Sequence, residues 1–401
     1  MDIRTTAKIP AAYTYFGQFI DHDLTSEAYT PADSGPLEPR DLPNLRRHWL
    51  NLDCLYGDTP GKDANIYEDD EVSFRVGNPL FDVPLGADCI PRVADHRNLE
   101  NPLVRQVHAM FLLLHNAALT EIPGSLPASV RLRAARRRVC HQYQWLVRHD
   151  FLPMICEPDT YASILNGALI DWDGRFSIPT EFARAAFRFG HSMVRDSYTL
   201  TAPTNFSLKC LLRVKPTRPL RRGMAIRWGT FAGPSSSEHA ARINTEIACE
   251  LFHVPDHSVR LYRSIARETG EIALPWLTLR RGVAALLPCG QTVTEILGTK
   301  PIDPNPDLWA NLAAVQLEKE TPLWYYLLLE AASLEDGRCL GPVGSRIIAE
   351  TIEGALWANP DSYLRCYGRD WLPEPWLDRS SGRWRQIVNL YDLAVVVGLA
   401  P

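Results

Sequence analysis

The stretch from Asn101 to Leu119 limits the folds open to this chain more than any other segment. Asn101 followed by Pro102 is a typical helix start, because an asparagine side chain caps the first turn and proline fits the first helical position. The residues that follow are apolar almost all the way round a helix, at Val107, Met110, Phe111, Leu114 and Leu119. Such a helix has to be covered on every side. The sequence therefore predicts a helix buried at the centre of a domain.

Helical periodicity also dominates the rest of the chain. Pro10 starts an expected helix that runs through His22, and further helices are expected at about 130–153, 180–195, 237–254, 319–333, 343–358 and 383–398. Runs of alternating polar and apolar residues, which indicate strands, are few. No shift of composition divides the sequence. We therefore expect a mainly α fold with long loops and little β structure, in a single domain spanning residues 1–401.

The composition suits a globular protein. Of the 401 residues, 46% are hydrophobic and 22% are charged, and the formal net charge of −5 gives no reason to expect nucleic acid as a partner. No stretch reaches the ~18 apolar residues of a membrane span, and the N-terminus lacks the apolar core of an export signal. We expect a protein that is cytoplasmic, or released without a recognisable signal peptide. Its oligomeric state does not follow from the sequence.

Nine cysteines are scattered along the chain without a CxxC pair. This pattern argues against a structural zinc site and against a compact disulfide framework. It predicts mainly reduced thiols and leaves one or two disulfide bridges open.

Three short segments, far apart in the sequence, hold the residues of greatest chemical interest. In the first, Gln18 precedes His22 by one helical turn and points the same way, while Asp21 and Asp23 are turned to either side. A neutral histidine can take a proton from peroxide and return it near pH 7. For an isolated Asp-His-Asp, however, a hydrogen-bonded structural histidine is the commoner explanation.

The second segment, from Arg97 to Glu100, lies just before Pro102. Because proline disfavours helical geometry at the preceding residue, these charged side chains belong to the turn that enters the buried helix. Arg97 could supply the positive charge needed where negative charge develops as an O–O bond breaks. The alternative for Arg97 and Glu100 is an ordinary surface ion pair.

The third segment lies on a helix expected to begin at Pro179, with Phe187 and His191 one turn apart on its apolar face. His191 is either an axial iron ligand or a core histidine, and spacing does not separate the two. His108 and His115 share one face of the buried helix, where structural hydrogen bonding is favoured over metal binding.

Together these segments resemble the animal-type haem peroxidases of the peroxidase–cyclooxygenase superfamily, in its bacterial branch. The matching strings are residues 13–23, 51–57 and 95–104, followed by 107–108, 115–116, 150–153, 187–191, 274–290, 322–327 and 341–346. The similarity runs from about Pro10 to Leu364 in the order and rough spacing of the family. It favours the functional interpretation of His22, Arg97 and His191.

The resemblance implies a haem b cofactor and an enzyme that reduces hydrogen peroxide while oxidising an aromatic or halide donor, as in a response to oxidative stress. His22 then matches the distal histidine, Arg97 the distal arginine and Gln18 the glutamine beside them. His191 matches the proximal ligand of the haem iron. Asp21 and Glu100 occupy the positions whose carboxylates become esters to the haem in many members of the family.

The resemblance also implies a Ca²⁺ ion beside the distal helix. Its expected ligands are Asp23, the carbonyl oxygen of Trp49, Asn51 and Asp53. Two residues depart from the family pattern, since Asn51 replaces an aspartate and Arg47 replaces a threonine. We expect calcium to bind less tightly for this reason.

Other departures affect the haem itself. Thr278 stands where relatives have the asparagine that accepts a hydrogen bond from the proximal imidazole, three residues before Arg281, the expected partner of a haem propionate. Asn101 replaces the methionine that forms a sulfonium link in one branch of the family. Only nine residues precede the first match, so part of the haem cover is expected to be missing.

Two other functions compete with a peroxidase. A fatty-acid dioxygenase of the cyclooxygenase type would use a radical tyrosine three residues before the proximal histidine, where this chain has Arg188. A non-catalytic interaction module on the same scaffold would explain the altered Thr278 and Arg47. Such a module has no need of His22, Arg97 and His191 together.

Overall fold

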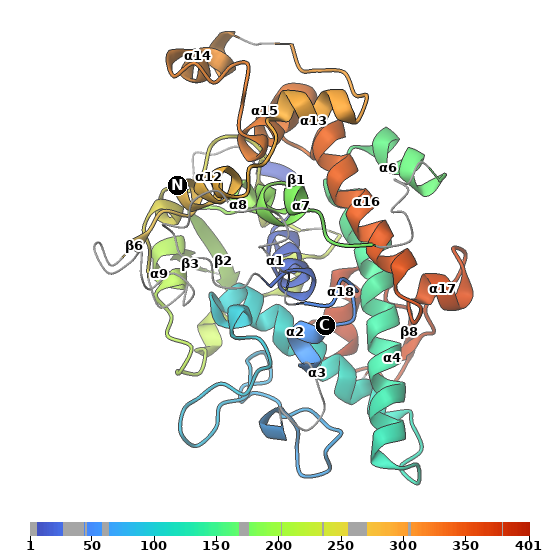
Figure 1. Ribbon diagram of the computed structural model, residues 1–401. Coiled ribbons are helices and arrows are strands. Elements are labelled where there is room, and N and C mark those ends of the chain that lie inside the picture. Colours follow the sequence, from blue (N-terminus) through green and yellow to red (C-terminus); the bar gives the residue numbers. More distant parts are fainter. Residues whose placement is uncertain are drawn as a thin grey trace.

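The computed structural model describes residues 6–26, 44, 46–57, 64–167, 176–201, 203–234, 236–255, 271–303, 306–378 and 380–401. Helices predominate throughout this part of the chain, so the predicted mainly α fold is confirmed (Figure 1). The longer helices are α1 (Ala12–Leu24), α3 (Pro102–Thr120), α4 (Ala128–Leu146), α6 (Pro158–Leu165), α12 (Leu274–Ala284), α14 (Pro306–Ala314), α15 (Leu323–Glu335) and α16 (Pro342–Ala358). Within the described ranges, no helix is both long enough and apolar enough to cross a membrane.

Shorter elements connect these helices. The short helices are α2 (Asp53–Tyr56), α5 (Leu152–Ile155), α7 (Thr180–Arg184), α8 (Gly190–Met193), α9 (Leu208–Leu212), α10 (Trp228–Phe231), α13 (Gly290–Ile296), α17 (Tyr363–Tyr367) and α18 (Leu390–Val396). The strands form two-stranded antiparallel sheets, β1 (Thr6–Pro10) with β4 (His239–Ala241), β2 (Ser197–Thr201) with β3 (Thr204–Ser207), β5 (Val254–Pro255) with β6 (Glu271–Ile272), and β7 (Trp376–Leu377) with β8 (Trp384–Arg385).

Helix α3 is buried as the sequence predicts. The side chain of Asn101 caps it, because its Oδ1 accepts hydrogen bonds from the backbone N–H groups of Leu103 and Val104 at 3.0 and 2.9 Å. The exposed fraction of Met110 and Phe111 is 0%. A helix apolar on every side is stable here because neighbouring elements cover all its faces.

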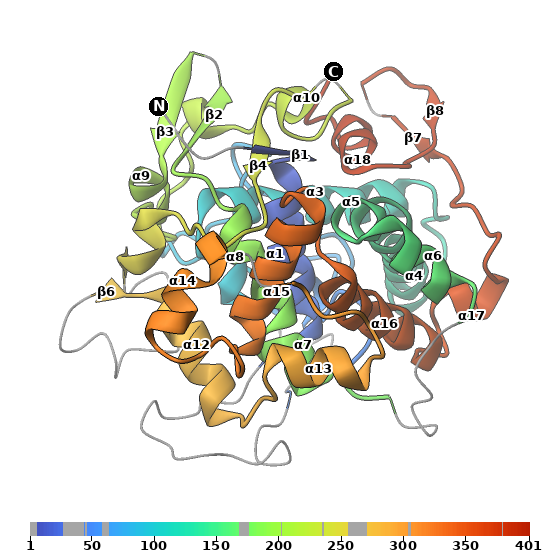
Figure 2. The same cartoon turned by 90° about the horizontal axis from the view of Figure 1, so that it is seen from above.

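Helix α1 packs against α3 and lies at the centre of the molecule in both views (Figures 1 and 2). The rings of Phe19 and Phe111 stack with centroids 5.0 Å apart, and Phe16 stacks on Phe111 at 6.2 Å. Because Gln18, Asp21 and His22 lie on this same helix, the aromatic stack fixes the position from which they project.

The start of α1 and the expected helix at 237–254 need correction. Residues Thr6–Pro10 form β1 and pair with β4 (His239–Ala241), so α1 begins at Ala12 rather than at Pro10. After β4 the chain forms a 3₁₀ turn, η7 (Cys249–Phe252), and then β5. Local periodicity could not anticipate this sheet, because its two strands are more than 200 residues apart.

Other helix boundaries were only partly right. The segment at 130–153 is α4, followed by a π-helical turn, η4 (Val147–Phe151), and α5. The segment at 180–195 is broken into α7, a 3₁₀ turn η5 (Ala186–Phe189) and α8, because Ala185 leaves the helical region with φ −131° and ψ −67°. At 383–398 only α18 is helical, after β8. The helices at 319–333 and 343–358 are confirmed as α15 and α16.

All nine cysteines are free thiols in the structure. None of the disulfide bridges left open by the sequence is present in the structure.

Candidate functional site

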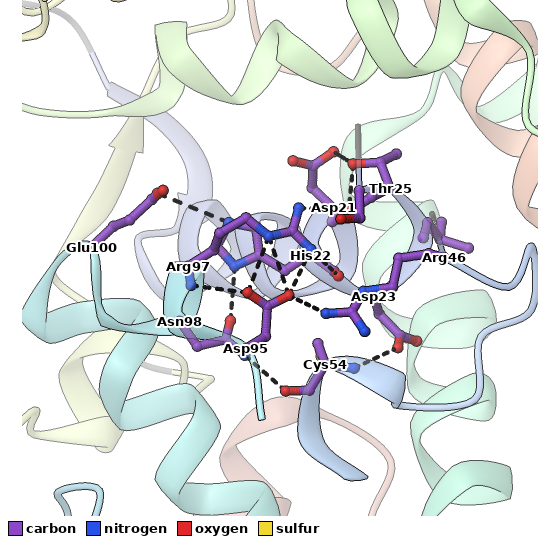
Figure 3. Close-up of polar contacts among 12 residues, drawn as sticks. Asp21, His22, Asp23, Thr25, Arg46, Cys54, Asp95, Arg97, Asn98 and Glu100 are labelled. Carbon is purple, nitrogen blue, oxygen red and sulfur yellow. Dashed lines mark hydrogen bonds and ion pairs between the residues drawn. The ribbon is translucent and has the colours of Figure 1, made fainter. Parts of the chain in front are cut away.

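His22 lies on α1, and its side chain is buried against η3 (His96–Leu99), the 3₁₀ turn that enters α3. Its Nδ1 lies 2.8 Å from Oδ1 of Asn98, and its Nε2 lies 3.9 Å from Oε2 of Glu100 (Figure 3). Burial, together with the positive charge of Arg97, lowers the pKa of His22 to about 4. The imidazole is therefore neutral near pH 7, as a proton acceptor for peroxide has to be.

Gln18 and Glu100 stand beside His22. Gln18 Nε2 donates to Oε2 of Glu100 at 3.0 Å, and Gln18 Oε1 accepts from the side-chain amide of Asn101, also at 3.0 Å. Burial raises the pKa of Glu100 to about 8, so its carboxyl is largely protonated at pH 7. The structure thus brings together three of the residues that the sequence placed on the distal side.

Arg97 contacts His22 through the backbone rather than through the imidazole. Its guanidinium donates to the carbonyl oxygens of His22 at 2.7 Å and Thr25 at 2.6 Å. Its Nε and Nη2 bind the carboxylate of Asp95 at 3.1 and 2.6 Å. Burial raises the pKa of Asp95, but Arg97 and the cations nearby more than offset this and hold it well below its usual range. Asp95 also pairs with Arg46, so one carboxylate holds two guanidinium groups at the end of α1.

Asp21 connects the distal helix to the segment that carries His191. Its Oδ2 accepts from Nη1 of Arg188 at 2.9 Å, and its Oδ1 accepts from the hydroxyl of Thr25, also at 2.9 Å. Arg188 lies in η5, three residues before His191. Both carboxylate oxygens of this expected haem-ester residue therefore have protein partners.

His191 lies on α8, and its Nδ1 is 3.5 Å from Oγ1 of Thr278 on α12. The Thr278 hydroxyl donates to the carbonyl oxygen of Leu274 at 3.0 Å, so it accepts from the imidazole. Burial and the charges of Arg188 and Arg281 lower the pKa of His191 to about 3. The predicted contact between Thr278 and His191 is thus present, and its length makes it a weak one.

The indole of Trp324 borders His191. The two rings meet edge to face with centroids 6.1 Å apart, and Trp324 Nε1 donates to the carbonyl oxygen of Arg188 at 3.1 Å. Trp324 lies on α15 and so attaches that helix to the segment that carries His191.

These residues fit a haem. The imidazoles of His22 and His191 are both neutral, and the Nδ1 of each faces a protein partner. Each therefore presents its Nε2, the nitrogen that would accept a proton on one side and ligate iron on the other. Arg281 is close enough to lower the pKa of His191, as expected of a residue that would bind a propionate.

The expected calcium ligands lie where the end of α1 meets the loop that leads into α2. Asp23 is fully buried and accepts from the backbone N–H groups of Leu52 at 3.1 Å and Cys54 at 3.4 Å. Burial and the negative charge of Asp53 raise the pKa of Asp23 to about 7. The two carboxylates are thus close enough to repel each other.

Arg136 on α4 binds the same loop. Its Nη2 donates to Oδ1 of Asp53 at 3.0 Å and to the carbonyl oxygen of Asn51 at 3.2 Å. The carbonyl oxygen of Trp49 accepts from the backbone N–H of Asn51 at 2.8 Å. Nowhere in the described ranges do three or more His, Cys, Asp or Glu side chains form a group that could hold a metal ion. A cation here would depend on amide and backbone oxygens as well as on the two aspartates.

The sequence interpretation passed over Asn98 and Asp95. Each lies within two residues of Arg97, and Asp95 also caps η3 by accepting from the backbone N–H of Arg97. Their position beside Arg97 was the only signal in the sequence. His108 and His115 bind Asn98 and Tyr56 respectively, at 3.0 Å each, which agrees with the structural role expected of them.

Comparisons with known proteins agree with this arrangement. Residues 33–225 match the model of the animal haem peroxidase family. A peroxidase-like protein of Margaritifera margaritifera is 26% identical over half of this chain, and the match covers 33% of that relative, so the chain spans about a third of its length.

Solved structures share the fold. Peroxidase A of Dictyostelium discoideum matches with a TM-score of 0.63 at 16% identity, over 92% of this chain and 83% of that chain. The fatty acid alpha-dioxygenase of Arabidopsis thaliana matches with a TM-score of 0.67 at 14% identity, over 90% and 67% of the two chains. At such identities the likeness shows the fold alone. The family match covers residues 33–225, just under half of the chain, so the comparisons together show a likeness to the animal haem peroxidases and their helical fold.

Proposed function

We propose that this chain is a haem peroxidase that reduces hydrogen peroxide and oxidises an aromatic or halide donor. The observation that carries the proposal is the pair of neutral imidazoles, the buried His22 and the partly buried His191, each with a partner at Nδ1. When bound, haem would supply the iron at which the O–O bond of peroxide is broken.

The protein residues would move and hold the protons of this reaction. Nε2 of His22 would accept a proton from one oxygen of the peroxide and return it to the departing oxygen. Gln18 and Glu100 lie beside that nitrogen and supply hydrogen-bonding groups for the peroxide. Arg97 holds the end of α1 through the carbonyl oxygen of His22, and its charge is shared with Asp95.

The proposal is tested by adding haem to the purified full chain. We expect a Soret band and peroxide-dependent oxidation of a phenolic dye. His191→Ala should lose the bound haem, whereas the matched replacement of an exposed histidine, His253→Ala, should keep both haem and activity. A wild-type protein that stays colourless after haem addition would refute the proposal and favour the non-catalytic module.

The ester links form a finer part of the proposal. The carboxyl of Glu100 is largely protonated near pH 7 because burial raises its pKa. Among the described residues, it accepts a hydrogen bond from Gln18 and lies 3.9 Å from Nε2 of His22. Asp21 would have to exchange its bonds to Arg188 and Thr25 for an ester. Haem that resists extraction by acidified acetone after peroxide treatment, and becomes extractable in Glu100→Gln, supports the link at Glu100.

Calcium is a further part of the proposal, and two orphaned oxygens support it. Asn51 Oδ1 and Asp53 Oδ2 are buried without a hydrogen-bond partner among the described residues. A hard cation would satisfy both and would offset the repulsion between Asp23 and Asp53. Because Arg136 already binds the other oxygen of Asp53, the affinity would be reduced.

A fatty-acid dioxygenase is the weaker alternative, although two fatty acid alpha-dioxygenases of known structure share the fold of this chain. Three residues before His191 the chain has the guanidinium of Arg188, paired with Asp21, where a radical tyrosine would be needed. Consumption of oxygen with an unsaturated fatty acid, in the absence of peroxide, would support this alternative.

A further inference from the structure

We propose that Asn98 is a positioning residue that fixes which nitrogen of His22 carries the proton. The inference rests on the peroxidase function proposed above and names a residue to which neither the motif comparison nor the family match assigns a role. It starts from the hydrogen bonds around the side-chain amide of Asn98, which is fully buried between α1, α2 and α3 (Figure 3).

The orientation of this amide is set by Cys54. The carbonyl oxygen of Cys54 lies 3.4 Å from Nδ2 of Asn98, and a carbonyl oxygen only accepts hydrogen bonds. The amide nitrogen therefore belongs on that side. Its oxygen, Oδ1, then faces Nδ1 of His22 at 2.8 Å.

His108 takes the tautomer that this orientation of the amide requires. Its Nδ1 lies 3.0 Å from Nδ2 of Asn98 and accepts the second amide proton. The proton of this imidazole is then on Nε2, which is buried without a partner among the described residues. The orientation set by Cys54 therefore leaves one buried donor of His108 unpaired, at a cost of about 1–3 kcal/mol.

The consequence for His22 follows from the amide. Both protons of the amide nitrogen are used, and the atom that faces His22 is an acceptor. The neutral imidazole of His22 therefore carries its proton on Nδ1 and has a lone pair on Nε2. In the opposite tautomer, the lone pair of His22 Nδ1 would face a lone pair of Asn98 Oδ1 at 2.8 Å. Asn98 thus holds His22 in the one neutral form whose Nε2 accepts a proton from peroxide.

Kinetics of three variants test the role. Asn98→Leu removes the acceptor with little change of volume. Asn98→Asp keeps an acceptor for Nδ1–H. Gln142→Leu is the matched control, since Gln142 is an equally buried amide that bridges Ile387 and Trp376 far from His22. An unchanged Soret band shows in each case that haem and His191 are in place.

We expect Asn98→Leu to lower the rate constant for the reaction with peroxide by about 10–100-fold, the usual effect of losing a residue that orients a reactive side chain. The rate of cyanide binding should fall in parallel, because hydrogen cyanide also gives up its proton as it binds. Oxidation of the dye by enzyme that has already reacted with peroxide should keep its rate. Asn98→Asp should recover most of the loss, and the control should match the wild type.

The tautomer itself is read by NMR of full-length protein labelled with ¹⁵N-histidine, in the diamagnetic ferrous carbon monoxide form. The signals of His22 are those that disappear in His22→Gln. We expect the proton on Nδ1 in the wild type and in Asn98→Asp. A proton on Nε2 in the wild type, or wild-type rates in Asn98→Leu, would overturn the inference. Failure to take up haem would instead refute the peroxidase function, and the tautomer would then be read from the haem-free chain.

Discussion

Asp21 and Arg188 form an ion pair with an O–N distance of 2.9 Å that joins α1 to the segment carrying His191. The two residues are 167 positions apart, and each belongs to a different one of the three motifs found in the sequence. Burial raises the pKa of Asp21, but the positive charges of Arg188 and Arg97 more than offset this and lower it below its usual value. The carboxylate is therefore ionised in the folded protein.

Removing Arg188 should destabilise the protein and change its response to acid. Arg188→Gln leaves the Asp21 carboxylate with one cation fewer, which we expect to cost roughly 2 kcal/mol at pH 7. Because the folded pKa of Asp21 is lowered, the stability it provides is present above pH 3.8 and is lost as the pH falls further. Urea unfolding at pH 7 and in acid measures both effects. Arg92→Gln, which breaks an exposed ion pair with Asp88, should cost less than about 1 kcal/mol.

Glu100 should make stability depend on pH in the opposite direction. Burial raises its pKa from 4.5 to about 8, so the folded state favours the protonated carboxyl. The resulting stability is complete below pH 4.5 and is lost as the pH rises to about 8. Glu100→Gln, which is always neutral, should flatten that decline. Equal slopes for both proteins, in denaturant titrations without haem, would show that Glu100 has an ordinary pKa.

Thr278 should set the reduction potential of a bound haem. Its hydroxyl contacts Nδ1 of His191 at 3.5 Å, so the imidazole is only weakly polarised. Thr278→Asn offers a longer acceptor, should strengthen this bond and should make His191 a better donor to the iron, which lowers the potential. Thr278→Val removes the acceptor and should raise it. Redox titration followed by the Soret band measures both, and a shift in the same direction for both variants would contradict the assignment.

Removal of calcium should lower the melting temperature. A chelator would leave the carboxylates of Asp23 and Asp53 without a cation between them, and added Ca²⁺ should restore the loss. Asp23→Asn should melt at a temperature that neither chelator nor Ca²⁺ changes. A wild-type protein that is equally insensitive to both would show that Arg136 alone neutralises this loop.

The buried pair of Asp82 and Arg105 should matter for stability without affecting the haem. Both side chains are 1% exposed, and Arg105 also donates to the carbonyl oxygens of Pro216 and Arg218. Arg105→Met leaves a buried carboxylate without its cation, so we expect a loss of about 3–5 kcal/mol. The double variant Asp82→Leu with Arg105→Met should recover part of it. A single variant as stable as the wild type would mean that Asp82 takes up a proton at little cost.

Much of the fold could be predicted because the signals are local. The cap at Asn101, the proline after it and the apolar run of α3 lie within one stretch of sequence, and each acts through neighbouring residues. Helices α15 and α16 could also be predicted, because each has a proline at its start and an apolar run within one stretch of sequence. The β1–β4 pairing and the break at Ala185 could not be predicted, because both depend on contacts with distant segments.

For the site, the sequence by itself determined which residues are candidates for the chemistry. Gln18 and His22 share one face of α1 as their spacing predicts, and Glu100 lies in the turn that enters α3, because residue type and spacing are properties of the chain. Tertiary structure decided their partners. Arg46 pairs with Asp95, Arg188 binds Asp21, and Asn98 faces Nδ1 of His22, so the charges and hydrogen bonds around these residues depend on segments that meet only in the folded protein. Hydrogen bonds act over about 3 Å, and only folding brings such atoms within that distance.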